Sequence, residues 1–99
     1  MIRHIVAWNF RPEIKEEEKP ILIREFQSLL AVLPTAIPEI VSLEVTLQVL
    51  SSCDAEIVLD STFQSEEALS AYIVHPLHVK AAEFIKPHIQ DRTCLDFIL

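Results

Sequence analysis

Glycine is entirely absent from this sequence of 99 residues. Loops that cradle phosphate groups, as in dinucleotide-binding and P-loop proteins, need glycine because a side chain would hold the backbone away from the phosphate. The absence therefore argues against nucleotide-dependent chemistry. We expect no cofactor.

Basic residues are few and scattered. The chain has 8 Lys and Arg against 15 Asp and Glu, which gives a formal net charge of −7. A nucleic-acid partner requires clustered Lys and Arg to neutralise phosphates. We therefore expect no nucleic-acid partner.

Long apolar runs are also missing. The longest uninterrupted run covers only Leu29 to Leu33, whereas a helix needs about 20 apolar residues to cross a bilayer. The first four residues lead straight into a strand pattern, without the features of a signal peptide. The sequence predicts no contact with a membrane and a cytoplasmic location.

Cysteine is limited to Cys53 and Cys94, which are far apart and form no Cys-x-x-Cys motif. A zinc knuckle or redox motif is therefore not indicated. We predict two reduced, mostly buried thiols. A bond between them is not expected, because the first strand separates the third and fourth strands of the fold predicted below, and a disulfide needs Cα atoms within about 7 Å.

What the sequence does contain is 51% hydrophobic residues, enough for one domain over residues 1–99 with a substantial core. Apolar residues alternate in the strand pattern over residues 2–10, 40–50, 57–63 and 92–99. In the second of these strands, Val41, Leu43 and Val45 should share the inward face. Helical spacing runs over residues 16–33, with Ile21, Leu22 and Phe26 among its apolar positions, and again after Ser65, a good N-cap. A short turn at residues 51–54 suits a hairpin between the second and third strands.

The order strand, helix, strand, strand, helix, strand predicts an α+β fold of the ferredoxin-like βαββαβ type. The first and third strands are central in that topology. Their second face carries Ile5, Ala7 and Val58, although no helix of the fold covers it. A second subunit is the simplest cover, so we expect a homodimer.

The segment Tyr72-Ile73-Val74-His75-Pro76-Leu77-His78 holds the only tyrosine and two of the four histidines. Pro76 should end one helix near Val74 and start another, with His75 as its cap. His78 would then be the third residue of the new helix, near the positive end of its dipole, which disfavours the imidazolium form. A neutral imidazole can act as a base or a ligand. From spacing alone, we favour a His78 that only forms a hydrogen bond with nearby backbone. A Tyr72 that merely fills the core is as well supported as one that lines a site.

Several of these stretches resemble the stress-responsive A/B barrel (Dabb) family. They are Arg3-His4-Ile5-Val6, Phe63-Gln64-Ser65-Glu66-Glu67-Ala68-Leu69 leading to Tyr72, His75-Pro76-Leu77-His78-Val79, residues 87–92 and Asp96-Phe97. The resemblance covers essentially the whole chain and implies a dimeric α+β barrel. The family includes plant stress-associated proteins, bacterial members without an assigned activity, and a plant polyketide cyclase that works by aldol condensation.

The resemblance to that cyclase also implies site residues. Its catalytic histidine and tyrosine correspond to His78 and Tyr72, and its first-strand histidine and C-terminal aspartate correspond to His4 and Asp96. Three positions depart from it: Ile57 and Phe26 replace a histidine and a tyrosine, and Glu39 replaces a glycine that many members carry. These losses argue against the cyclase's own substrate.

The sequence thus predicts a mainly apolar pocket between sheet and helices that binds a small organic molecule. We expect His78 and Tyr72 as the catalytic pair and His4, Trp8 and Asp96 as substrate-binding residues. Two histidines three apart without a third ligand are a weak metal signal, so no metal is expected. One hypothesis is cofactor-free acid/base chemistry on a carbonyl compound, such as cyclisation or isomerisation. The other is a non-catalytic small-ligand-binding or stress-response homodimer; a monooxygenase is a third possibility.

Overall fold

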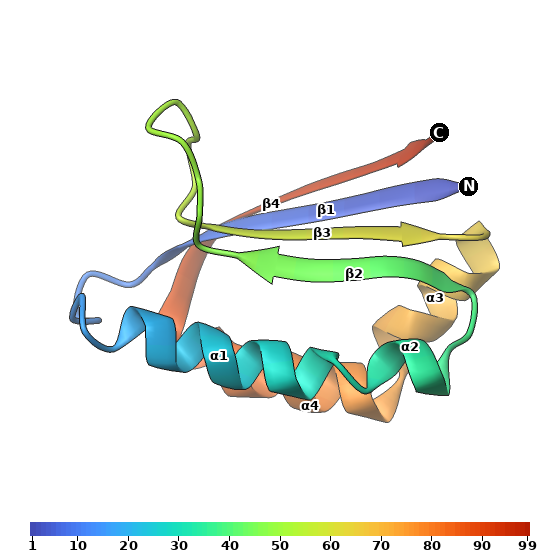
Figure 1. Cartoon of the computed structure of the whole chain (residues 1–99), viewed down its shortest axis with the longest axis horizontal. Coiled ribbons are helices and arrows are strands. Elements are labelled where there is room, and N and C mark those ends of the chain that lie inside the picture. Colours follow the sequence, from blue (N-terminus) through green and yellow to red (C-terminus); the bar gives the residue numbers. More distant parts are fainter.

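Helices and strands follow one another in the predicted order (Figure 1). A computed structural model describes all 99 residues. The strands are β1 (Ile2–Phe10), β2 (Ile40–Thr46), β3 (Ile57–Phe63) and β4 (Ile89–Ile98). The helices are α1 (Lys19–Leu30), α2 (Leu33–Ala36), α3 (Glu66–Val74) and α4 (Pro76–Ile85), followed by the 3-10 turn η1 (Lys86–His88).

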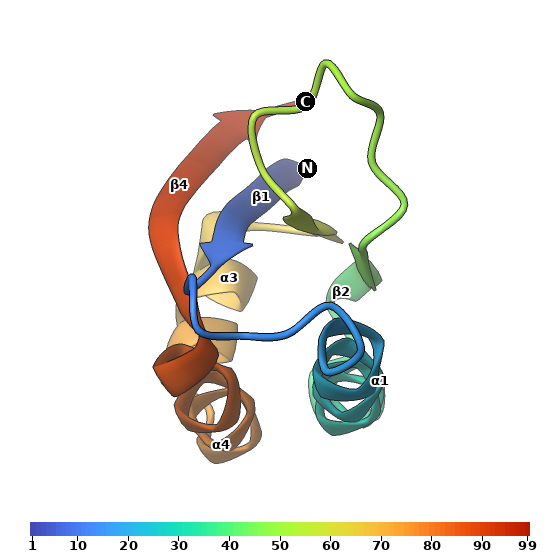
Figure 2. The ribbon, with the colours of Figure 1, turned by 90° about the vertical axis from the view of Figure 1, so that its left-hand side faces the viewer.

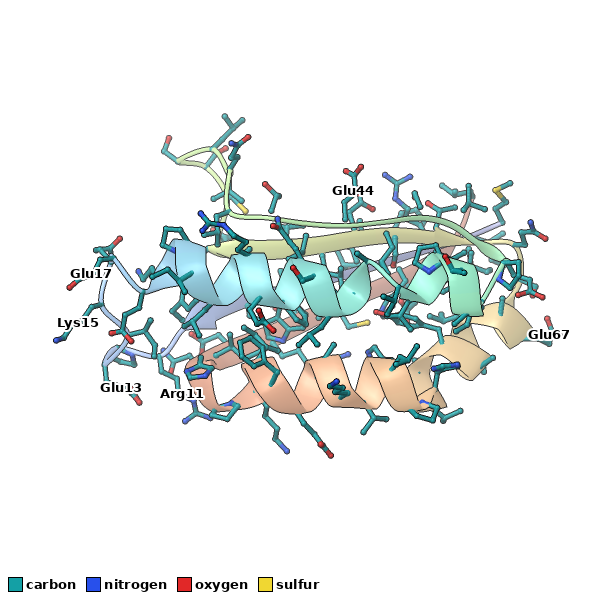
Figure 3. The ribbon with its side chains drawn as sticks, turned by 60° about the horizontal axis from the view of Figure 1, so that its bottom comes forward. Arg11, Glu13, Lys15, Glu17, Glu44 and Glu67 are labelled. Atoms are coloured by element: carbon teal, nitrogen blue, oxygen red, sulfur yellow. The ribbon has the colours of Figure 1, made fainter.

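The strands form one antiparallel sheet in the order β2-β3-β1-β4. The helices all lie on one face of this sheet, and no helix covers the other (Figure 2). Seen from the helix side, α1 and α4 run next to each other beneath the sheet (Figure 3). The predicted ferredoxin-like α+β fold, with β1 and β3 central, is confirmed.

The core fills the space between sheet and helices. Along β1 every second residue is buried, because alternate side chains point to the helix side. Ile57, Leu59 and Phe63 of β3 do the same. Each fully buried aliphatic or aromatic side chain contributes roughly 1.5–3 kcal/mol to stability, so this layer holds the helices in place over the cavity described below.

The first helix is shorter than the spacing predicted. It begins at Lys19, since Pro20 fits only in a first turn, and it faces the core with Ile23, Phe26 and Leu30. The prediction that Ile21 faces the core is wrong, because its side chain is 63% exposed. The inward face of this helix carries Ile23, then Phe26 three residues later and Leu30 four residues after Phe26.

The second strand is also shorter than predicted, ending at Thr46. Its pairing with β3 shifts between Ile40 and Ser42, and this irregularity leaves Val41 half exposed instead of facing the helices. Residues 47–56 form a loop that rises on the side away from the helices (Figure 1). The predicted hairpin is present, but its connection is longer than the expected turn.

The break between α3 and α4 forms as predicted. Ser65 Oγ accepts a hydrogen bond from Ala68 N at 3.1 Å and caps α3. Pro76 is the first residue of α4, and His75 Nδ1 accepts from Leu77 N at 3.1 Å. His78 is therefore the third residue of α4.

The last strand begins at Ile89, three residues before the predicted start. Thr93 pairs with Ala7 and Gln90 with Asn9, so Asp91 and Arg92 together lie opposite the single residue Trp8. This is a β-bulge. Asp91 adopts a φ of 58°, a conformation that aspartate tolerates better than most residues.

Both cysteines are free. The expectation that both are mostly buried is wrong for Cys53, which is exposed in the β2–β3 loop because that loop projects from the sheet. Cys94 is half-buried on β4. No helix in the structure combines the length and the apolar character needed to cross a membrane.

Candidate functional site

A cavity of about 310 Å³ lies between the helix side of the sheet and helices α3 and α4. Its volume is at the lower end of the roughly 300–1,000 Å³ typical of small-molecule sites. Most of its wall is hydrophobic. The lining residues are His4, Val6, Trp8, Phe26, Leu59, Tyr72, Ile73, His78, Ala82, Ile85, Lys86, Ile89 and Arg92.

Tyr72, on α3, is completely buried at the wall of this cavity. Its hydroxyl has no hydrogen-bond partner and is the one buried side-chain polar atom in that condition. Burial raises the pKa of Tyr72, so the hydroxyl keeps its proton and remains a donor. An unsatisfied buried donor costs roughly 1–3 kcal/mol, and a bound oxygen atom would remove that cost.

His78 lies directly against Tyr72, with 4.3 Å between ring centroids. Its Nδ1 is 2.9 Å from the carbonyl oxygen of Ile73. A carbonyl only accepts, so Nδ1 carries the proton and Nε2 of the neutral ring carries a lone pair. Desolvation lowers the pKa of His78 and the nearby His4 acts in the same direction, whereas the bond to Ile73 raises it. The net effect favours a neutral imidazole beside a protonated phenol.

His4, on β1, is 4% exposed and meets the Tyr72 ring edge-on at 6.2 Å. Its Nδ1–H donates to the carboxylate of Asp96 on the neighbouring strand β4. Asp96 is half exposed and is not a lining residue of the cavity. It reaches the site only through His4, whose ring orientation it fixes.

Trp8 lines the cavity next to Phe26, at 6.1 Å between ring centroids. Four of the five predicted site residues therefore line one cavity. The fifth, Asp96, lies outside the cavity and contacts His4. Lys86 and Arg92 also line the cavity, although neither was predicted as a site residue. A lysine at a helix end and an arginine at a strand start gave no signal of that role. For Arg92 it depends on the bulge in β4.

Three side chains could approach a metal ion. Donor atoms of His4, Cys94 and Asp96 lie within 4.8 Å of one another. They already interact among themselves, because His4 donates to Asp96 and Cys94 Sγ is 3.9 Å from His4 Nδ1. Burial, followed by the charge of Asp96, raises the pKa of Cys94, which disfavours the thiolate that metals bind. We assign these residues to a hydrogen-bonded cluster.

The sequence profile of the "Stress responsive A/B Barrel Domain" family, Dabb, matches residues 2–99. The chain belongs to the Dabb family. This confirms the resemblance to the family seen in the sequence.

Among known proteins, this Dabb chain is 28% identical over 78 residues to olivetolic acid cyclase of Cannabis sativa, covering 79% of this chain and 76% of the cyclase. A dimeric ferredoxin-like protein of unknown function from Bacteroides fragilis superposes with a TM-score of 0.88 at 28% identity, covering 99% of this chain and 95% of that one. A dimeric ferredoxin-like protein of unknown function from Thermobifida fusca has a TM-score of 0.81 at 25% identity, with 99% and 90% covered.

Proposed function

We propose that this Dabb protein binds a small, largely apolar carbonyl compound in the cavity and catalyses proton transfer at the carbon next to the carbonyl, without a cofactor. One observation carries the proposal: Tyr72, whose hydroxyl is buried and unpartnered, packs its ring against that of His78, whose pKa is lowered by burial. A donor and a base next to each other in an apolar site are the two groups that such a reaction needs.

The chemistry follows from the two protonation states. The Tyr72 hydroxyl donates a hydrogen bond to the substrate carbonyl oxygen, while Nε2 of His78 takes a proton from the adjacent carbon. The electron pair of the broken C–H bond shifts into the carbonyl and forms an enolate, whose charge the Tyr72 hydrogen bond stabilises. A positioned base of this kind typically contributes about 10²- to 10⁴-fold in rate.

The similarity to a cyclase supports this choice, and the departures from it limit the substrate. Phe26 and Ile57 are buried apolar residues here, where the cyclase carries a tyrosine and a histidine. Phe26 lines the cavity and Ile57 does not, so the cavity wall lacks the hydroxyl that a tyrosine at position 26 would offer. We expect a substrate with fewer polar groups than that of the cyclase.

The functional unit in this proposal is a homodimer that covers the open face of the sheet. Leu95 and Phe97 of β4 are 54% and 45% exposed on that face, next to half-buried Ile5 and Ala7 of β1. Contiguous apolar surface of this kind is typical of an interface. The similar proteins from Bacteroides fragilis and Thermobifida fusca are dimeric.

The test is the exchange of the α-protons of octan-2-one in D₂O, followed by proton NMR. We expect the wild-type protein to accelerate exchange, His78→Ala to fall to the background rate, and Tyr72→Phe to lose about 10²-fold because the enolate loses its donor. Lys80→Met, an exposed change outside the cavity lining, should leave the rate unchanged.

A wild-type protein that binds octan-2-one, as seen by shifts of cavity resonances, yet leaves its exchange rate at background would contradict the catalytic proposal. The non-catalytic binding homodimer would then be the better description of this Dabb protein.

A further inference from the structure

We propose that the ligand also carries a carboxylate, which Lys86 and Arg92 bind at the cavity. This inference rests on the proposed function, since it defines the substrate class of the same site. The ligand would be a keto acid with an apolar chain: the chain in the hydrophobic part, the carbonyl at Tyr72 and the carboxylate at the two cations.

Lys86 and Arg92 reach the cavity from two different elements. Lys86 opens η1 directly after α4, and Arg92 lies on β4. Both side chains are exposed to solvent yet line the cavity. Exposure to solvent at a cavity wall is what a site for a charged group needs, because the cations keep part of their hydration when the cavity is empty.

The β-bulge allows Arg92 to take this position. Ile89 and Arg92 are three residues apart, so in a regular strand they would point to opposite faces. The extra residue in β4 opposite Trp8 lets both line the cavity. Bulges of this kind commonly redirect a side chain next to a functional site. Asp91 absorbs the distortion with its positive φ, and its carboxylate accepts a hydrogen bond from Asn9 Nδ2 at 3.1 Å.

The charge around the cavity is the opposite of that of the whole chain. The net charge is −7, yet no Asp or Glu lines the cavity and two of the 8 basic residues do. Glu13, Lys15 and Glu17, in the segment before α1, project outward (Figure 3).

Neither cavity cation has a carboxylate partner. The ion pairs of Lys and Arg in the structure are Arg3–Asp60, Lys19–Glu16 and Lys19–Glu56. Two cations without a carboxylate partner at a mainly apolar cavity favour an anionic ligand, and the planar guanidinium of Arg92 matches a carboxylate.

The experiment compares octanoate with octanamide, which have the same chain and differ in charge. Trp8 is the only tryptophan and lines the cavity, so its fluorescence reports binding of either probe. We expect octanoate to bind wild type at least fivefold more tightly, and Lys86→Met and Arg92→Met each to weaken octanoate about threefold to fivefold, as for partly solvated ion pairs. Octanamide affinity should stay within about twofold, which also shows that the variants are folded. Lys80→Met is the matched control and should bind both probes like wild type.

Equal affinities for octanoate and octanamide in the wild type would overturn the carboxylate site while leaving the cavity proposal intact. So would unchanged octanoate binding in the double variant of Lys86 and Arg92. If neither probe alters Trp8 fluorescence at millimolar concentration, the carboxylate site and ligand binding in the cavity both fail.

Discussion

At the scale of single residues, the site depends on Tyr72 and His78, whose surroundings favour opposite chemical roles, proton donor and base. Burial raises the pKa of Tyr72, so the hydroxyl stays protonated, and burial lowers the pKa of His78, so the ring stays neutral. The bond from His78 Nδ1 to Ile73 leaves Nε2 as the basic atom. A proton donor and a base therefore coexist at neutral pH. The proposed step uses no metal ion.

The unpartnered hydroxyl of Tyr72 gives a prediction about stability. Tyr72→Phe should increase the free energy of unfolding of the unliganded protein by about 1 kcal/mol, because it removes a buried donor that makes no hydrogen bond. Urea denaturation measures the difference. A variant that is less stable than wild type by a similar amount would mean that the hydroxyl has a partner in the folded protein.

At the scale of elements, the α3–α4 break sets the position of His78. Pro76 ends α3 and starts α4, and the His75 cap fixes the first turn in which His78 lies. The break is a local device, because it needs only the proline and the residue before it. It brings His78 back against Tyr72 of the preceding helix.

His75→Ala should lower the free energy of unfolding by roughly 0.5–2 kcal/mol, the usual loss when an N-cap side chain is removed. His75→Asp should recover most of it, since a carboxylate also accepts from the Leu77 backbone N–H. Urea denaturation of both variants provides the comparison. Equal stability of His75→Ala and wild type would show that this cap contributes nothing.

Local sequence rules correctly predicted the helix ends that depend on one or two neighbouring residues, such as the Ser65 cap and the Pro76 break. They failed where pairing between distant segments decides the outcome. Val41 turned outward because of the irregularity against β3, and Arg92 reached the cavity because of the bulge opposite Trp8. The Tyr72–His78 pair could be predicted from the sequence because both residues belong to one short segment. That the Tyr72 hydroxyl lacks a hydrogen-bond partner could not be predicted, since this depends on how the side chains pack.

At the scale of the whole molecule, the two faces of the sheet have different roles. The helix face holds the core and the cavity, whereas the open face combines apolar side chains with the Arg3–Asp60 ion pair, at 2.7 Å between Nε and Oδ1. The β2–β3 loop rises on the open side (Figure 1). A dimer formed through this face would leave the helix side, and the cavity within it, outside the interface.

Val58→Asp should therefore produce monomeric or insoluble protein, because it places an unpaired charge in the proposed interface. Val79→Asp is a matched control on α4, where the side chain is already 40% exposed on the helix side. Sedimentation at micromolar concentration should give about twice the chain mass of 11.3 kDa for wild type and this control. A wild-type protein that sediments only as single chains would contradict the homodimer.

The most direct test of the central proposal is the protonation of His78, read by long-range proton–nitrogen NMR across a pH titration. The measurement needs no ligand and gives both the pKa and the tautomer. We expect a pKa below the approximately 6.5 of a free histidine and, at pH 7.5, a proton on Nδ1 with Nε2 unprotonated, because Nδ1 is bonded to the Ile73 carbonyl in an environment that penalises charge. A His78 that titrates at or above 6.5, or that carries its proton on Nε2, would contradict its proposed role as the base.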